Sequence, residues 1–94
     1  MTEASGARGR RRIQVLGRQW CHLCHDMEVA LRPIAAEFGL DLETVDVDMD
    51  PELEARWDEW VPVLLVDGEY VCHYHLDEIR LRALLISFPV HSGR

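Results

Sequence analysis

The chain has 94 residues, of which 48% are apolar, so it is long enough for one compact domain and too short for two. Its formal net charge is −7, and acidic residues dominate after the first dozen positions, which argues against nucleic acid as a partner. No apolar run reaches the roughly 18 residues of a membrane span, and none follows the N-terminal arginines as a secretory signal requires, so we expect no membrane partner and a cytoplasmic location.

The first half of the chain predicts a tail, a strand and a helix. Residues 1–11 are rich in glycine, serine, alanine and arginine without periodicity, which is typical of a disordered tail. A short apolar pattern predicts a strand at Arg12–Gly17. Apolar side chains then recur at helical spacing and predict a helix at about His22–Glu37, with these residues facing the core: Met27, Leu31, Ile34 and Phe38.

A second strand and a short helix follow. The segment Leu40–Val47 is apolar and β-branched enough to predict a central strand. Asp50 and Pro51 form a helix start, with the aspartate as N-cap and the proline at the first helical position. We expect that helix to turn Leu53 and Trp57 inward.

The last third predicts a hairpin and a covering helix. Asp67-Gly68 is a strong two-residue turn signal between the strands Pro62–Val66 and Glu69–Cys72. A helix is expected from about Leu76 to Ser87, ending before Pro89. Its predicted inward-facing residues are Ile79, Ala83, Leu84 and Ile86.

This order of elements predicts an α/β fold of the form βαβ–(α)–ββα. A parallel strand pair joined by a helix precedes an antiparallel hairpin and a further helix, giving a central mixed four-stranded sheet flanked by helices. The predicted domain covers residues 12–88, between the tail at 1–11 and a C-terminal tail at 89–94.

Cys21 and Cys24 form a C-x-x-C pair between the first predicted strand and its helix. Backbone N–H groups at the start of a helix have no carbonyl partner, and together with the helix dipole they favour the thiolate of Cys21. Cys24 lies one turn later, close enough to form a disulfide. His22 and His25 flank Cys24. As cations they would favour the thiolate and as neutral rings they would do little, and an exposed histidine is mostly neutral at pH 7, so we expect only minor tuning. The pair therefore predicts a redox site.

Three landmarks together carry a resemblance to a known family. Cys21-His22-Leu23-Cys24 stands at the strand-to-helix turn, Val45-Asp46-Val47-Asp48 leads into a Pro-Glu helix start, and Val61-Pro62 opens the third strand. Over residues 12–88 this arrangement resembles the thioredoxin fold, and within it the bacterial glutaredoxin-like proteins with C-H-L-C followed by V-P-V-L. The resemblance implies a thiol–disulfide oxidoreductase that reduces protein disulfides or mixed disulfides.

The resemblance also implies roles for single residues. Pro62 is expected to be cis rather than an ordinary trans proline at a strand start, with Val61 offering its backbone N–H and C=O to an extended substrate or to glutathione. Arg18 either contacts the thiolate or a glutathione carboxylate, or is a solvated surface residue. Trp20 forms an apolar lip or packs on the sheet edge, and Trp60 invites the same two interpretations. The assigned catalytic residues are Cys21 and Cys24, and the substrate-binding residues are Arg18, Trp20, His22, Val61 and Pro62.

The expected chemistry is a two-step exchange. Cys21 attacks a substrate disulfide, and Cys24 then attacks the mixed disulfide to release the reduced product. We expect no bound cofactor and no metal, with glutathione or another low-molecular-weight thiol as co-substrate, disulfide-containing proteins as partners, and a monomer. The segment Val71–His75 lacks the Gly-Gly that glutaredoxins use to hold glutathione before the last helix.

Other sites stay open at this point. Cys21, Cys24, Cys72 and His75 have spacings that zinc accepts, and a related possibility is an iron–sulfur cluster shared with glutathione across a dimer. Cys21, Cys24 and His25 also match the C-x-x-C-H pattern of haem attachment. Cys72 by itself is either a small buried hydrophobe or a third redox thiol.

Overall fold

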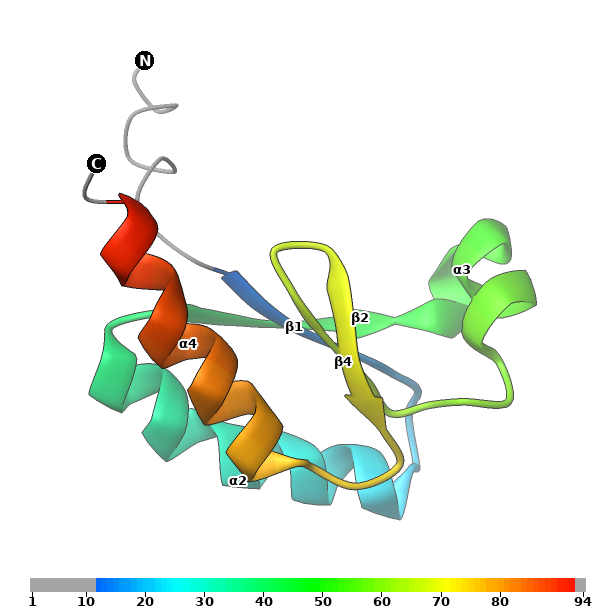
Figure 1. The fold of residues 1–94 in the computed structure, drawn as a ribbon. Coiled ribbons are helices and arrows are strands. Elements are labelled where there is room, and N and C mark those ends of the chain that lie inside the picture. The colour runs from blue at the N-terminus through cyan, green and yellow to red at the C-terminus, as the bar shows by residue number, and fades with distance from the viewer. Residues whose placement is uncertain (1–11, 93–94) are drawn as a thin grey trace.

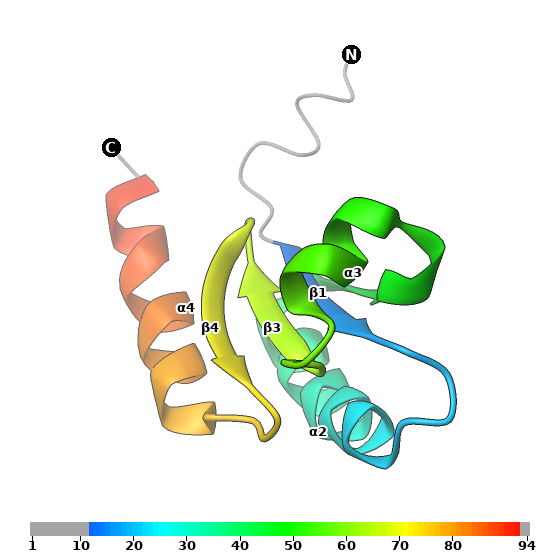
Figure 2. The same cartoon turned by 90° about the vertical axis from the view of Figure 1, so that its right-hand side faces the viewer.

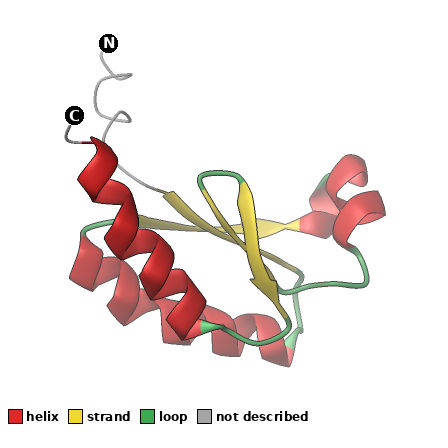
Figure 3. Cartoon of the chain, in the orientation of Figure 1, coloured by secondary structure: helices red, strands yellow, loops and turns green. Residues whose placement is uncertain are grey.

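Four strands form one mixed sheet in the order β2-β1-β3-β4 (Figures 1 and 3). The computed structural model describes the backbone of residues 12–92 and the side chains of residues 12–86, so the predicted tail at 1–11 lies outside it. The elements are β1 (Arg12–Gly17), α2 (His22–Phe38), β2 (Asp41–Asp46), the 3₁₀ turn η1 (Val47–Met49), α3 (Pro51–Trp57), β3 (Val63–Val66), β4 (Glu69–His73) and α4 (Glu78–Ser92). The predicted α/β order is confirmed.

The strand pairing corrects one expectation. β1 pairs with β2 in parallel and with β3 antiparallel, and β3 pairs with β4 antiparallel across the Asp67-Gly68 turn. The segment predicted as a central strand is therefore an edge strand, because β1 has the hairpin on its other side. The acidic residues Asp41, Glu43 and Asp46 suit this edge position, since charged side chains discourage pairing with other chains.

Helices cover both faces of the sheet (Figure 2). α2 and α4 bury the larger core against one face, and its fully buried members include Ile13, Leu31, Leu64 and Leu81. α3 covers part of the other face, where Leu16, Val47 and Val63 form a smaller core. Leu53 and Trp57 of α3 pack against this smaller core as predicted.

Caps fix the start of α3 and the end of α2. Asp50 caps α3 by accepting from the Glu52 and Leu53 amides at 3.0 and 3.4 Å. Gly39 ends α2 in the left-handed region at φ 66°, which glycine adopts without a steric penalty.

The inward face of α4 differs from the prediction. Leu81 and Leu85 are buried, whereas Ile79 is 84% exposed and Ile86 is 60% exposed. Of the residues predicted to face inward, Leu84 alone packs on the core. Apolar residues occur all round this helix, so its periodicity does not define a face and packing against the sheet and α2 decides it.

The end of α4 is also later than predicted. The helix continues to Ser92 and contains Pro89, which was expected to follow its end. Proline lacks one amide but keeps a helical φ, so its presence alone does not end a helix. None of the helices in the described part of the chain is long and apolar enough to cross a membrane.

Candidate redox site

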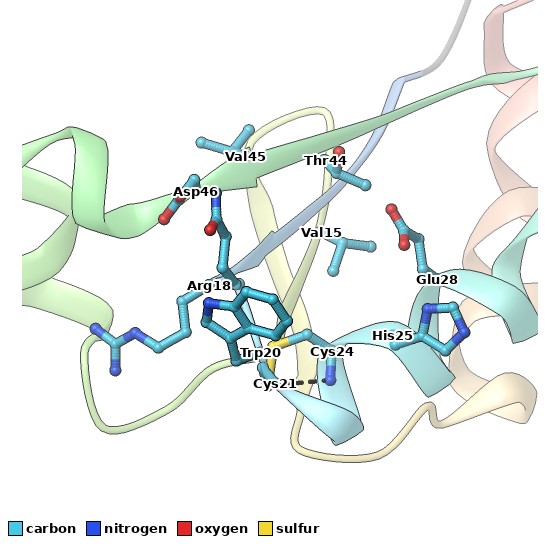
Figure 4. Close-up of a pocket in the computed structure, with 12 residues that line it drawn as sticks. Val15, Arg18, Trp20, Cys21, Cys24, His25, Glu28, Thr44, Val45 and Asp46 are labelled. Atoms are coloured by element: carbon cyan, nitrogen blue, oxygen red, sulfur yellow. Dashed lines mark hydrogen bonds between the residues drawn. A yellow bond between two sulfur atoms is a disulfide. The ribbon is translucent and has the colours of Figure 1, made fainter.

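The two cysteines of the C-x-x-C lie where β1 gives way to α2 (Figure 4). Cys21 is the N-cap of α2, and its sulfur accepts a hydrogen bond from the Cys24 amide at 3.2 Å. A disulfide joins Cys21 to Cys24, with 5.2 Å between their Cα atoms. The predicted disulfide is thus confirmed, and the Cys24 amide faces the sulfur of Cys21.

The two sulfurs differ in accessibility. Cys21 is half-buried and Cys24 is buried. Both line a cavity of about 360 Å³ between α2 and the edge strand β2. Cys21 is therefore the more accessible cysteine of the pair, and Cys24 lies behind it on the protein side.

Gly17 is a site residue that the sequence analysis missed. A Cβ atom placed on this glycine would lie 2.8 Å from Cys24 Sγ and 3.1 Å from Cys24 Cβ. Only a residue without a side chain fits there. The available signal was a glycine at the end of a strand, which often marks a close approach of another chain segment.

The loop between α3 and β3 lies beside the cysteine loop. Its Val61–Pro62 peptide bond is cis, as predicted. Within the described residues no group hydrogen bonds to the backbone N–H or C=O of Val61. These groups are free to bind an extended segment, so the predicted substrate contact stays a prediction that the geometry permits.

Arg18 joins the two loops. Its guanidinium contacts Asp48 at 2.8 Å and Asp58 at 2.7 Å, and in Figure 4 it extends away from the cysteine pair. Hydrogen bonds to the two carboxylates raise the pKa of Arg18, so it remains a cation. The arginine therefore ties the cysteine loop to the segment before Pro62, and its contact with substrate stays a prediction.

The aromatic and imidazole side chains near the site are accessible. Trp20 is 98% exposed with φ 63°, which excludes the interpretation that it packs on the sheet edge. It lines the cavity beside Cys21. His22 and His25 are exposed on the first turn of α2. The position of Trp20 in the cavity lining beside Cys21 fits the apolar-lip interpretation.

Tyr74 lies in the segment before α4, which contains no glycine. Its φ of 65° lies in the left-handed region, which costs a residue with a side chain about 1 kcal/mol. The Tyr74 amide donates to Pro62 O at 2.8 Å, and its hydroxyl donates to Glu59 O at 2.8 Å. These bonds fasten the β4–α4 loop to the cis-proline loop.

Cys72 is a buried free thiol in the larger core. Burial raises the pKa of this thiol, which keeps it protonated and unreactive. Its burial fits the small-hydrophobe interpretation. No three of the candidate metal ligands Cys21, Cys24, Cys72 and His75 come together, since the described residues contain no such cluster. The metal alternatives are therefore not favoured.

Comparisons with known proteins agree with this geometry. A family model described as a glutaredoxin-like domain matches residues 12–86. An uncharacterised protein of Mycobacterium tuberculosis is 34% identical over 79 residues, which cover 79% of this chain and 81% of that protein. The solution structure of protein Ne2328 from Nitrosomonas europaea has a TM-score of 0.73 at 32% identity, covering 80% of this chain and 91% of that one.

A thioredoxin from Fasciola hepatica shares the fold. Its crystal structure has a TM-score of 0.64 at 23% identity, covering 90% of this chain and 86% of that chain. At this identity the likeness bears on architecture alone. It confirms the predicted thioredoxin-like fold, a mixed four-stranded sheet with helices on both faces.

Proposed function

The chain belongs to the glutaredoxin-like domain family, and we propose that it is a thiol–disulfide oxidoreductase that reduces protein disulfides or mixed disulfides. One observation carries this proposal. An accessible cysteine at a helix N-terminus is bonded to a buried cysteine one turn later, and the amide of the second faces the sulfur of the first. This is the geometry that disulfide exchange requires.

The reaction begins with the reduced pair. The Cys21 thiolate attacks one sulfur of the substrate disulfide, forming a mixed disulfide and releasing the other sulfur as a thiolate. Cys24 loses its proton to solvent and attacks the Sγ of Cys21, which releases the second substrate thiolate. The substrate gains two electrons, and with two protons it becomes a dithiol while Cys21 and Cys24 become the disulfide.

The surroundings support this sequence of steps. The Cys24 amide at 3.2 Å stabilises charge on Cys21, and the first turn of α2 has no acidic residue to oppose that charge. Val61, next to the cis Pro62, has free backbone groups for an extended substrate. Trp20 and His22, which flank Cys21 in the chain, are both exposed.

A complete cycle needs a thiol reductant. We propose glutathione or another low-molecular-weight thiol as this co-substrate, because two thiols per turnover restore the Cys21–Cys24 dithiol. The protein would act as a monomer without a bound cofactor in the cytoplasm, where such thiols are abundant. Its net charge of −7 is unsuited to nucleic acid.

The deciding experiment compares two substrates across four proteins. Reduction of a small glutathione mixed disulfide and of a protein disulfide is measured for the wild type, Cys21→Ser and Cys24→Ser, with Cys72→Ala as the matched cysteine control. We expect Cys21→Ser to abolish both activities and Cys24→Ser to abolish reduction of the protein disulfide. Retained activity in Cys21→Ser on either substrate would disprove the mechanism.

A further inference from the structure

Five ring side chains form a continuous surface that the redox chemistry does not use. Trp57 stacks on Tyr70 at 6.3 Å between ring centroids, and Tyr70 contacts His73 at 5.9 Å. His73 then meets Trp60 at 4.9 Å and Tyr74 at 4.5 Å. We call these five residues the aromatic strip.

The strip is open to solvent and reaches the redox site. Trp60 and Tyr70 are each 45% exposed and Tyr74 is 41% exposed. In Figure 2, α3 stands in front of the β1 side of the sheet, and no helix stands in front of β4. Trp60 directly precedes Val61 and the cis Pro62, so the strip continues the surface to which we assign substrate backbone.

The rings are held in place before any partner arrives. The Tyr74 hydroxyl donates to Glu59 O at 2.8 Å, and the Tyr70 hydroxyl is hydrogen bonded to His73 Nδ1. A surface whose rings are fixed in advance loses little conformational entropy when it binds. Exposed rings forgo the stabilisation that burial of their apolar area would give the free protein. Their exposure as a group therefore favours a role in contact with a partner.

The charges around the strip select the partner. Glu54 and Glu59 lie beside Trp60, and within the described residues neither carboxylate has an ion pair. Together with Trp60 they line a cavity of about 490 Å³. The guanidinium of Arg56 already lies 5.1 Å from the centre of the Trp57 ring. Aromatic faces flanked by unpaired carboxylates complement a cation.

We propose that the aromatic strip binds an extended segment of a protein substrate that carries arginine or lysine beside its reactive disulfide. The proposal rests on the proposed function, because it names the substrate class of the same site. Val61 binds the backbone next to the cysteine, and the basic side chain stacks on Trp60 or Tyr74 near Glu59. Specificity arises from charge and stacking rather than from the exchange chemistry.

The test uses two peptides that differ only in charge. Each contains one cysteine in a mixed disulfide with a chromogenic thiol, and it is flanked by three arginines in one peptide and three glutamates in the other. For the wild type we expect kcat/KM to be about tenfold higher for the arginine peptide. In Trp60→Ala, and separately in Glu54→Gln/Glu59→Gln, this ratio should fall to within twofold of one. The control Ile79→Ala, an exposed apolar residue on α4, should keep the wild-type ratio.

A binding measurement separates the two hypotheses. In the Cys21→Ser/Cys24→Ser protein, titration with a cysteine-free arginine peptide should quench tryptophan fluorescence, and Trp60→Ala should weaken this binding. If the arginine peptide bound but the wild type reduced neither mixed disulfide, the proposed function would be overturned and the binding role of the aromatic strip would be supported. Reduction of both peptides at equal rates, a preference that survives Trp60→Ala, or a dimer that Trp60→Ala dissociates would each overturn the strip's assignment.

Discussion

The sulfur of Cys24 lies against the backbone of Gly17, where an added Cβ would be 2.8 Å from it. The contact joins the end of β1 to the first turn of α2, so the position of the buried sulfur depends on a residue with no side chain. Because the disulfide also holds this sulfur, it has no rotamer into which it can retreat from a new methyl group.

Replacing Gly17 with alanine should therefore affect both stability and exchange. We expect a loss of about 1–3 kcal/mol in the free energy of unfolding, as overpacking of a core produces, and slower reduction of protein disulfides. Urea denaturation and initial rates measure the two effects. Gly68→Ala is the control, because its φ of 85° makes alanine unfavourable in a turn with open space around it. That variant should lose stability and keep its exchange rate.

Arg18→Met should loosen the cis-proline loop. The substitution removes the contacts with Asp48 and Asp58, so we expect faster amide hydrogen exchange in residues 58–62 and a several-fold higher KM for protein disulfides. Arg18→Lys should recover only part of the effect, since one ammonium group replaces a planar fork. If Arg18→Met left amide hydrogen exchange in residues 58–62 unchanged and raised the measured pKa of Cys21, the arginine would act on the thiolate instead.

Asp50→Ala should destabilise α3. Asp50 Oδ1 accepts from the Glu52 and Leu53 amides, and loss of such a cap costs about 1 kcal/mol. Asp50→Asn keeps an acceptor oxygen and should stay within a few tenths of a kcal/mol of the wild type. Urea unfolding of the oxidised protein gives both values. Equal losses in the two variants would contradict the capping role.

Cys72 should make stability fall at alkaline pH. Burial raises the pKa of this thiol in the folded state, so above the unfolded value of about 8.5 the unfolded chain releases a proton that the folded chain keeps. The free energy of unfolding then decreases with pH by up to about 1.4 kcal/mol per unit until the folded pKa is passed.

The measurement compares the wild type with Cys72→Ala, both with the Cys21–Cys24 disulfide intact. The alanine variant should be less stable at neutral pH because it leaves a small cavity. As the pH is raised above about 8.5, its free energy of unfolding should fall less than that of the wild type. Parallel curves for the two proteins would mean that Cys72 does not contribute to the alkaline loss.

Much of this protein is determined locally, and for that reason the sequence alone predicts it. The Cys21 and Asp50 caps, the Asp67-Gly68 turn and the apolar stripe of α2 each act within a few residues, so their patterns are present in the linear chain. The redox pair belongs to this class, because the N-cap position of Cys21 and its bond from the Cys24 amide involve only neighbouring residues.

The remaining features depend on segments that are distant in the sequence. β2 is an edge strand because the hairpin pairs with the other side of β1, and the buried face of α4 is chosen by packing rather than by its uniform apolar pattern. The pairing of Arg18 with Asp58, the closeness of Gly17 to Cys24 and the gathering of five rings from α3, β4 and two loops appear only after folding. Local propensity acts over a few residues, whereas these contacts form when the sheet brings distant residues to within a few ångströms.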